Sequence, residues 1–130
     1  MHFTYGGTAA DTTGFTKILA GHVNEYLKPH TTILPEHVRV SNSASAMHDV
    51  LAWALADSRD AFLVSRPVYG RLELDFFNRA GVRVEYADTT AENCFDEDVV
   101  GKFEAAIKDC ASRGVEVKAL FIINPNNPLG

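Results

Sequence analysis

The sequence predicts a three-layer α/β/α domain built on a mostly parallel β-sheet. Segments with apolar residues at helical spacing alternate with short, continuous apolar segments that are typical of buried strands. The chain has 130 residues, enough for one hydrophobic core, and its 46% hydrophobic and 22% charged residues are the balance of a globular protein. Strands that alternate with helices pair in parallel through right-handed crossovers, so helices should cover both faces of the sheet.

The chain is expected to begin with a helix, a loop, a short strand and a second helix. Apolar residues recur at three- and four-residue intervals over 15–27. Pro29 ends this helix near Lys28, because proline cannot donate to the helical ladder. After a loop, residues 38–41 are expected to form a strand. Residues 44–57 have almost no β-branching and are expected to form a buried helix.

The second half of the chain alternates regularly between strand and helix patterns. Its strands are compact apolar or alternating runs, and its helices carry apolar residues at helical spacing. Gly81 is the natural C-terminal cap of one of these helices. The expected elements are a strand over 61–65, a helix over 69–80, a strand over 82–87, a helix over 96–112 and a strand over 117–123.

Composition argues against several classes of function. The net charge of -5, with scattered lysines and arginines, argues against a nucleic-acid partner. Cys94 and Cys110 lack the spacing of a disulfide scaffold or redox motif, and the five histidines lack metal-ligand spacing, so two reduced thiols and no zinc are expected. No segment has the roughly 20 apolar residues of a membrane span, and a soluble, cytoplasmic protein without a membrane partner is expected.

Ligands of such sheets bind where strands end in loops, and three of these exits are informative. Residues 41–46 place small and hydroxyl side chains at a helix start, which suits a phosphate, although helix capping by the same residues is the simpler alternative. Tyr69 follows a strand and a proline and could cover a flat ring or serve ordinary packing. Residues 124–130, N-P-N-N-P-L-G, form a rigid polar turn directly after a buried strand and are the most specific feature of the chain.

This last segment resembles the N-P-x-N-P-x-G signature of class I and II aminotransferases, which are pyridoxal-phosphate (PLP) enzymes of fold type I. The likeness extends over nearly the whole chain. Within the family, the chain most resembles the aminocyclopropane-carboxylate-synthase-like branch. It implies that residues 1–130 are the N-terminal part of the PLP-binding large domain, an incomplete PLP-transferase fold. The other matching segments are T-Y-G, Y-L-K-P, I-L-P-E-H-V-R-V, A-W-A-L-A-D and R-P-V-Y-G.

The resemblance implies a role for five residues around pyridoxal 5'-phosphate. Ala44 and Ser45 would hold the phosphate, Tyr69 would stack on the pyridine ring, and Asn127 would hydrogen-bond the phenolic oxygen. Tyr5 would reach the cofactor of the partner subunit in a homodimer. The Asn127–Pro128 peptide is a candidate cis bond.

The resemblance also implies what the chain lacks. The five lysines, Lys17, Lys28, Lys102, Lys108 and Lys118, do not lie in a motif like that of the family's Schiff-base lysine. No catalytic residue is therefore expected, and the 130-residue chain alone should not turn over substrate. The phosphate turn also has Asn42 and Ser43 where the family often has glycine.

Three functional interpretations follow. The first is part of a PLP-dependent aminotransferase or lyase that acts on an amino-acid substrate. The second is a non-catalytic, truncated remnant that serves only as a binding or interaction domain. The third, a Rossmann-type nucleotide binder, requires a glycine fingerprint after the first strand and an acidic residue after the second, and neither is present.

Overall fold

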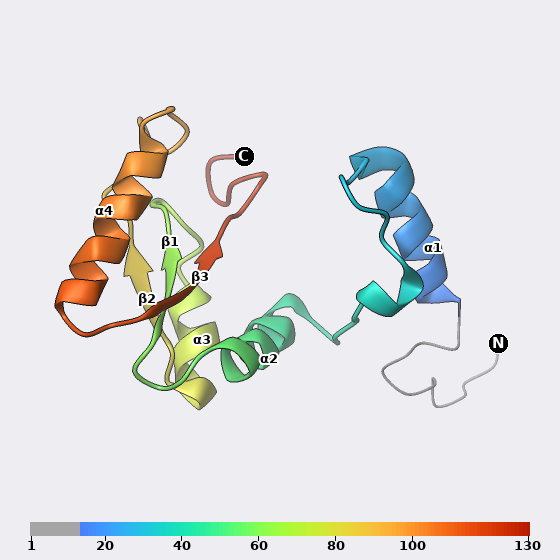
Figure 1. Ribbon diagram of the computed structural model, residues 1–130, viewed down its shortest axis with the longest axis horizontal. Helices are drawn as coiled ribbons and strands as arrows, with labels where there is room; N and C mark the ends of the chain where they lie inside the picture. The colour runs from blue at the N-terminus through green and yellow to red at the C-terminus, as the bar shows by residue number, and fades with distance from the viewer. Residues whose placement is uncertain (1–13) are drawn as a thin grey trace. The chain divides into compact units, whose positions relative to one another are not determined.

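The computed structural model describes residues 14–130 (Figure 1). The chain divides into two compact units, one up to Asn42 and one over Ser43–Gly130. Each unit is described by itself. None of the helices in the described part of the chain is long and apolar enough to cross a membrane.

The first unit is a helix with a loop that folds back along it. Helix α1 (Phe15–His22) continues without a break into the π-helical turn η1 (Val23–Leu27), which confirms the helix expected over 15–27. Lys28 ends it in the left-handed conformation, with φ of 46°. The loop that follows is closed by Asn24, whose side-chain amide exchanges two hydrogen bonds of 2.8 Å with the backbone of Ile33.

The prediction of a strand over residues 38–41 is wrong. These residues follow the short 3-10 helix η2 (Pro35–His37) and have no strand partner in the described part of the chain. Val38 has an extended conformation, but an extended segment becomes a β-strand only when a neighbour takes up its backbone hydrogen bonds. Val40 is 61% exposed, so the apolar pattern of this segment does not reflect burial in this unit.

The second unit contains a three-stranded parallel sheet with strand order β2-β1-β3 (Figure 1). The strands are β1 (Ala61–Val64), β2 (Arg83–Tyr86) and β3 (Val117–Phe121). All four residues of β1 are buried, as expected for the central strand of a parallel sheet. The sequence placed these three strands correctly, to within two residues at each end.

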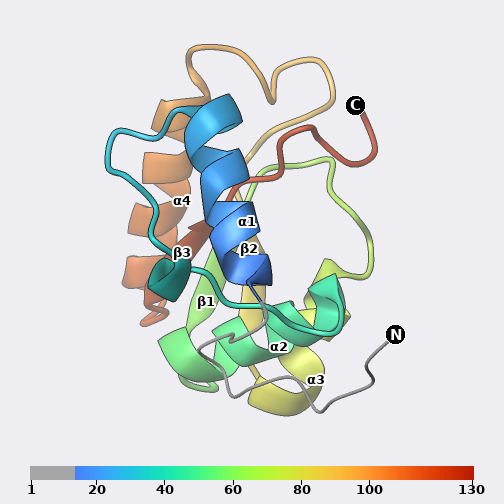
Figure 2. The ribbon, with the colours of Figure 1, turned by 90° about the vertical axis from the view of Figure 1, so that its right-hand side faces the viewer.

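Helices cover both faces of the sheet, which confirms the three-layer α/β/α prediction. Helices α2 (Ala44–Leu55) and α3 (Leu72–Ala80) pack side by side on one face (Figure 2). Helix α4 (Val99–Ser112) lies on the other face. Successive side chains of a strand point to opposite faces. Phe62 accordingly packs with α2 and α3, while Ala61 packs with Cys110 of α4.

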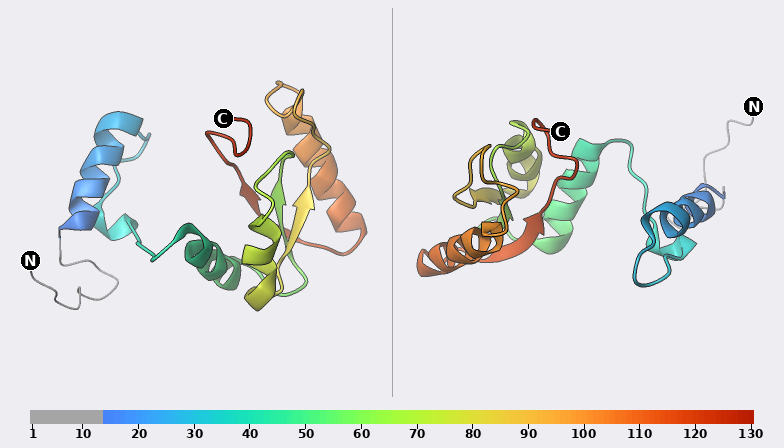
Figure 3. Two further views of the ribbon diagram at one scale, coloured as in Figure 1. Left: turned by 180° about the vertical axis from the view of Figure 1, so that it is seen from behind. Right: turned by 90° about the horizontal axis from the view of Figure 1, so that it is seen from above.

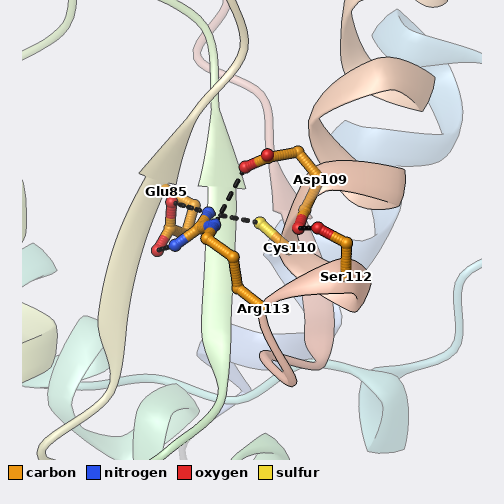
Figure 4. Close-up of polar contacts among 5 residues, drawn as sticks. All are labelled: Glu85, Asp109, Cys110, Ser112 and Arg113. Atoms are coloured by element: carbon orange, nitrogen blue, oxygen red, sulfur yellow. Dashed lines mark hydrogen bonds and ion pairs between the residues drawn. The ribbon is translucent and has the colours of Figure 1, made fainter.

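The C-terminal ends of α3 and α4 are each stabilised by one residue, Gly81 and Arg113. Gly81 ends α3 with φ of 70°, as the sequence predicted, and a Cβ there would lie 3.1 Å from the Cβ of Ser58. Beyond α4, Arg113 donates to both carboxylate oxygens of Glu85 at 3.2 and 2.8 Å and to Asp109 at 2.9 Å (Figure 4). This bidentate pair ties the end of α4 to strand β2.

Candidate functional site

The loops that follow β1 and β3 lie at the same edge of the sheet (Figure 3). Because the two strands are parallel neighbours, their carboxyl ends meet there. The Asn126 side-chain amide donates to the Pro67 carbonyl at 3.4 Å, and its carbonyl oxygen accepts from the Leu129 N–H at 3.1 Å. Asn126 is only 8% exposed, so it holds the second loop against the first. Two of the three predicted exits therefore come together.

The third exit is the start of helix α2. The Ser43 hydroxyl accepts a hydrogen bond from the Ala46 N–H at 3.1 Å, as an N-cap residue does. Capping therefore accounts for Ser43. Within residues 14–130, no acceptor is found for the backbone N–H groups of Ala44 and Ser45, and both residues are exposed. These two groups, at the positive end of a 12-residue helix, remain available to an anion.

A polar cluster joins the start of α2 to α3. Asp75 of α3 accepts from the Ser45 hydroxyl at 2.9 Å and from Nδ1 of His48 at 3.0 Å, and its side chain is only 4% exposed. Burial raises the pKa of Asp75. Hydrogen bonds from His48 and Ser45, with the charges of His48 and Arg71, outweigh burial and bring the pKa below its ordinary value. Asp75 is therefore an anion at neutral pH.

His48 also brings this cluster to the end of the sheet. Its ring contacts Phe121, the last residue of β3, edge-on at a centroid distance of 5.1 Å, and Phe76 of α3 at 5.3 Å. Since residues 124–130 follow β3 by two residues, the start of α2 and the N-P-N-N-P-L-G turn are near the same strand end.

The remaining predicted residues are placed as follows. Tyr69 is 41% exposed in the loop before α3, so it is not a core residue. Asn127 is exposed, and the Asn127–Pro128 peptide is cis, as predicted. In the described part of the chain, Ser45, Tyr69 and Asn127 make no hydrogen bond to one another. Tyr5 lies outside the described residues.

Asp75, His48 and Asn126 were not predicted from the sequence as site residues. Leu72 and Phe76 are both buried, and Asp75 lies three positions after the first and directly before the second. Asp75 is therefore on the inward face of α3. An acidic residue on the apolar face of a helix was the signal that could have identified it. Asn126 gave no such signal, because the sequence does not show which asparagine of the N-P-N-N-P turn points inward.

The turn and the parallel sheet agree with comparisons to known proteins. Residues 9–130 match the family described as aminotransferase class I and II. The chain belongs to this family. The match confirms the resemblance carried by the N-P-N-N-P-L-G turn, and members of the family are PLP enzymes.

Proteins named 1-aminocyclopropane-1-carboxylate synthase or synthase-like protein are similar to nearly all of the chain. It is 31% identical over 116 residues to 1-aminocyclopropane-1-carboxylate synthase 4 of Oryza sativa subsp. japonica, which covers 89% of this chain. It is 33% identical over 117 residues to 1-aminocyclopropane-1-carboxylate synthase-like protein 1 of Bos taurus, which covers 86%. The chain spans 23% of the length of each of these two relatives.

The available donors fit the phosphate of PLP in part. The backbone N–H groups of Ala44 and Ser45, which have no acceptor among the described residues, lie at a helix N-terminus beside a serine hydroxyl, and such groups bind phosphate. The charged Asp75 behind Ser45 opposes an anion at the same place. The start of α2 therefore offers donors of the kind that bind phosphate together with a competing acceptor.

Proposed function

We propose that this chain is the cofactor-binding part of a PLP-dependent aminotransferase or lyase that acts on amino acids. The observation that carries the proposal is the convergence of exits at one sheet edge, where Asn126 ties the family's signature turn to the loop that contains Tyr69. Membership of a family of PLP enzymes supports PLP as the cofactor. The Ala44 and Ser45 N–H groups, which have no acceptor among the described residues, support an anion site at the start of α2.

Each proposed contact has a definite task. The Ala44 and Ser45 N–H groups and the Ser45 hydroxyl would hold the phosphate. Tyr69 would lie against the ring, and the Asn127 amide would donate to the phenolic oxygen. When bound, PLP serves as the electron sink for bond cleavage at the substrate's α-carbon. The chain's own share is to bind and orient, because none of its lysines lies in a matching motif.

Ligand binding to the full chain tests this proposal. Pyridoxamine 5'-phosphate is a suitable probe because it has no aldehyde to react with surface lysines. We expect weak but phosphate-dependent binding in equilibrium dialysis, with a lower dissociation constant than for pyridoxamine. Tyr69→Leu should weaken binding, while Tyr26→Leu is the matched control, since Tyr26 is another exposed tyrosine and is not one of the proposed cofactor contacts. Equal binding of the two ligands would contradict the proposal.

The prediction that none of the five lysines of residues 1–130 forms a Schiff base has its own test. Pyridoxal 5'-phosphate added to the chain should dialyse away, and borohydride should not fix it at one specific lysine. A single lysine that is labelled stoichiometrically after dialysis would overturn this part of the proposal. A homodimer in which Tyr5 reaches the partner's cofactor, and a cytoplasmic location, belong to the same proposal.

A second candidate function is a non-catalytic interaction domain. The observation that favours it is that Ile122 and Phe95, which line one pocket beside the end of β3, are 78% and 66% exposed. Apolar surface of this kind marks an interface. If the chain self-associates or binds a partner but shows no preference for a phosphorylated pyridine, this function is supported instead.

A further inference from the structure

A buried carboxylate stands directly behind the proposed phosphate site. Oδ2 of Asp75 accepts from the Ser45 hydroxyl and from His48, and Oδ1 lies 3.4 Å from Nε of Arg71. Asp75 is 4% exposed, whereas the Arg71 side chain is 59% exposed. The shortest contacts of Asp75 are the two to Ser45 and His48 of α2, at 2.9 and 3.0 Å. They hold the start of α2 against α3.

These contacts limit what Ser45 can offer a ligand. A serine hydroxyl has one proton to donate, and an ionised carboxylate can only accept. In this structure the proton is donated to Asp75 at 2.9 Å. A bound phosphate would also need it, because its oxygens act as acceptors. The Ser45 hydroxyl therefore cannot donate to the Asp75 carboxylate and to a bound phosphate at the same time.

His48 provides Asp75 with a second donor. Nδ1 of His48 is 3.0 Å from the same oxygen, so that nitrogen carries a proton toward the carboxylate. The ring is held by Phe76 and Phe121, which keeps this donor in place if Ser45 turns away. Loss of the serine would still leave Asp75 hydrogen-bonded.

We propose that Asp75 is a positioning residue that competes with the cofactor phosphate for the Ser45 hydroxyl, and that His48 holds Asp75 when Ser45 is released to the phosphate. This inference rests on the proposed function. Asp75 then reduces affinity for phosphorylated ligands specifically, both by occupying the hydroxyl and by like-charge repulsion. Affinity for the unphosphorylated ring does not depend on it.

Two substitutions with opposite expected effects test this inference in the full chain. Asp75→Asn removes the charge and leaves a weaker acceptor, so pyridoxamine 5'-phosphate should bind roughly three- to tenfold more tightly. His48→Phe keeps a packed ring but removes the second donor, so Asp75 retains Ser45 more firmly and the same ligand should bind more weakly. Pyridoxamine binding should change in neither variant.

Ser45→Ala identifies the hydroxyl as the shared group. In the Ser45→Ala background, Asp75→Asn should give a smaller gain than in the wild-type chain, because only the charge effect remains. Circular dichroism of each variant checks that the fold is retained. If Asp75→Asn fails to bind the phosphorylated ligand more tightly, or His48→Phe binds it more tightly, the competition is refuted. If the wild-type chain shows no phosphate preference, the proposed function itself fails.

Discussion

Phe76 is the residue on which the packing of α2 and α3 against the sheet most depends. Its side chain is fully buried and contacts Phe62 of β1 edge-on at 4.9 Å and Phe121 of β3 at 5.3 Å between ring centroids. Burial of a phenylalanine contributes about 1.5–3 kcal/mol, and each aromatic pair adds about 0.5–1.5 kcal/mol. We therefore expect Phe76→Ala to lower the free energy of unfolding by about 3–5 kcal/mol, the range for buried phenylalanine truncations.

Phe77 is a matched control on the same helix. It is 56% exposed, so Phe77→Ala should cost less than about 1 kcal/mol. Urea unfolding followed by far-ultraviolet circular dichroism measures both. With a slope of about 2 kcal/mol per molar urea, a 4 kcal/mol loss lowers the midpoint by about 2 M. Phe76→Leu keeps most of the apolar volume and should fall between the two. Equal midpoints for Phe76→Ala and Phe77→Ala would refute this account of the core.

Three further predictions concern ionisation and backbone conformation. The pKa of Asp75 is lowered by folding, so its contribution to stability is complete above its unfolded pKa and is lost as the pH falls through its folded pKa. Asp75→Asn should therefore flatten the acid limb of stability against pH, measured by thermal unfolding. Burial, with a hydrogen bond to Glu73, raises the pKa of Tyr86 to about 12. Glu73→Gln should lower the pKa of Tyr86, measured by ultraviolet titration of tyrosinate. An unchanged pKa would contradict the pairing of Tyr86 with Glu73. Gly81→Ala should destabilise by about 1 kcal/mol or more, because φ is 70° and the added Cβ would meet Ser58. Gly101→Ala, inside α4 with open space around its Cβ, should stabilise by about 0.5–1 kcal/mol, and the same sign for both alanines would count against this reading.

Local patterns predicted most of the elements correctly. The helix over 15–27, the buried strand β1 and the cap at Gly81 follow from spacing, apolar content and the freedom of glycine at positive φ. The strand expected over 38–41 failed, because an apolar run shows that a segment can be extended but not that a partner strand lies beside it.

The sequence by itself determined the family, the parallel α/β sheet and the segments that end at its carboxyl edge. These depend on residues close together in the chain: helix periods, apolar runs and the N-P-N-N-P-L-G turn. Only the tertiary structure decided that Asn126 is the asparagine turned inward, and that Ser45 donates to Asp75, 30 residues further along. Such contacts depend on how α2 packs against α3 and how one loop folds over another, and no local pattern specifies that geometry.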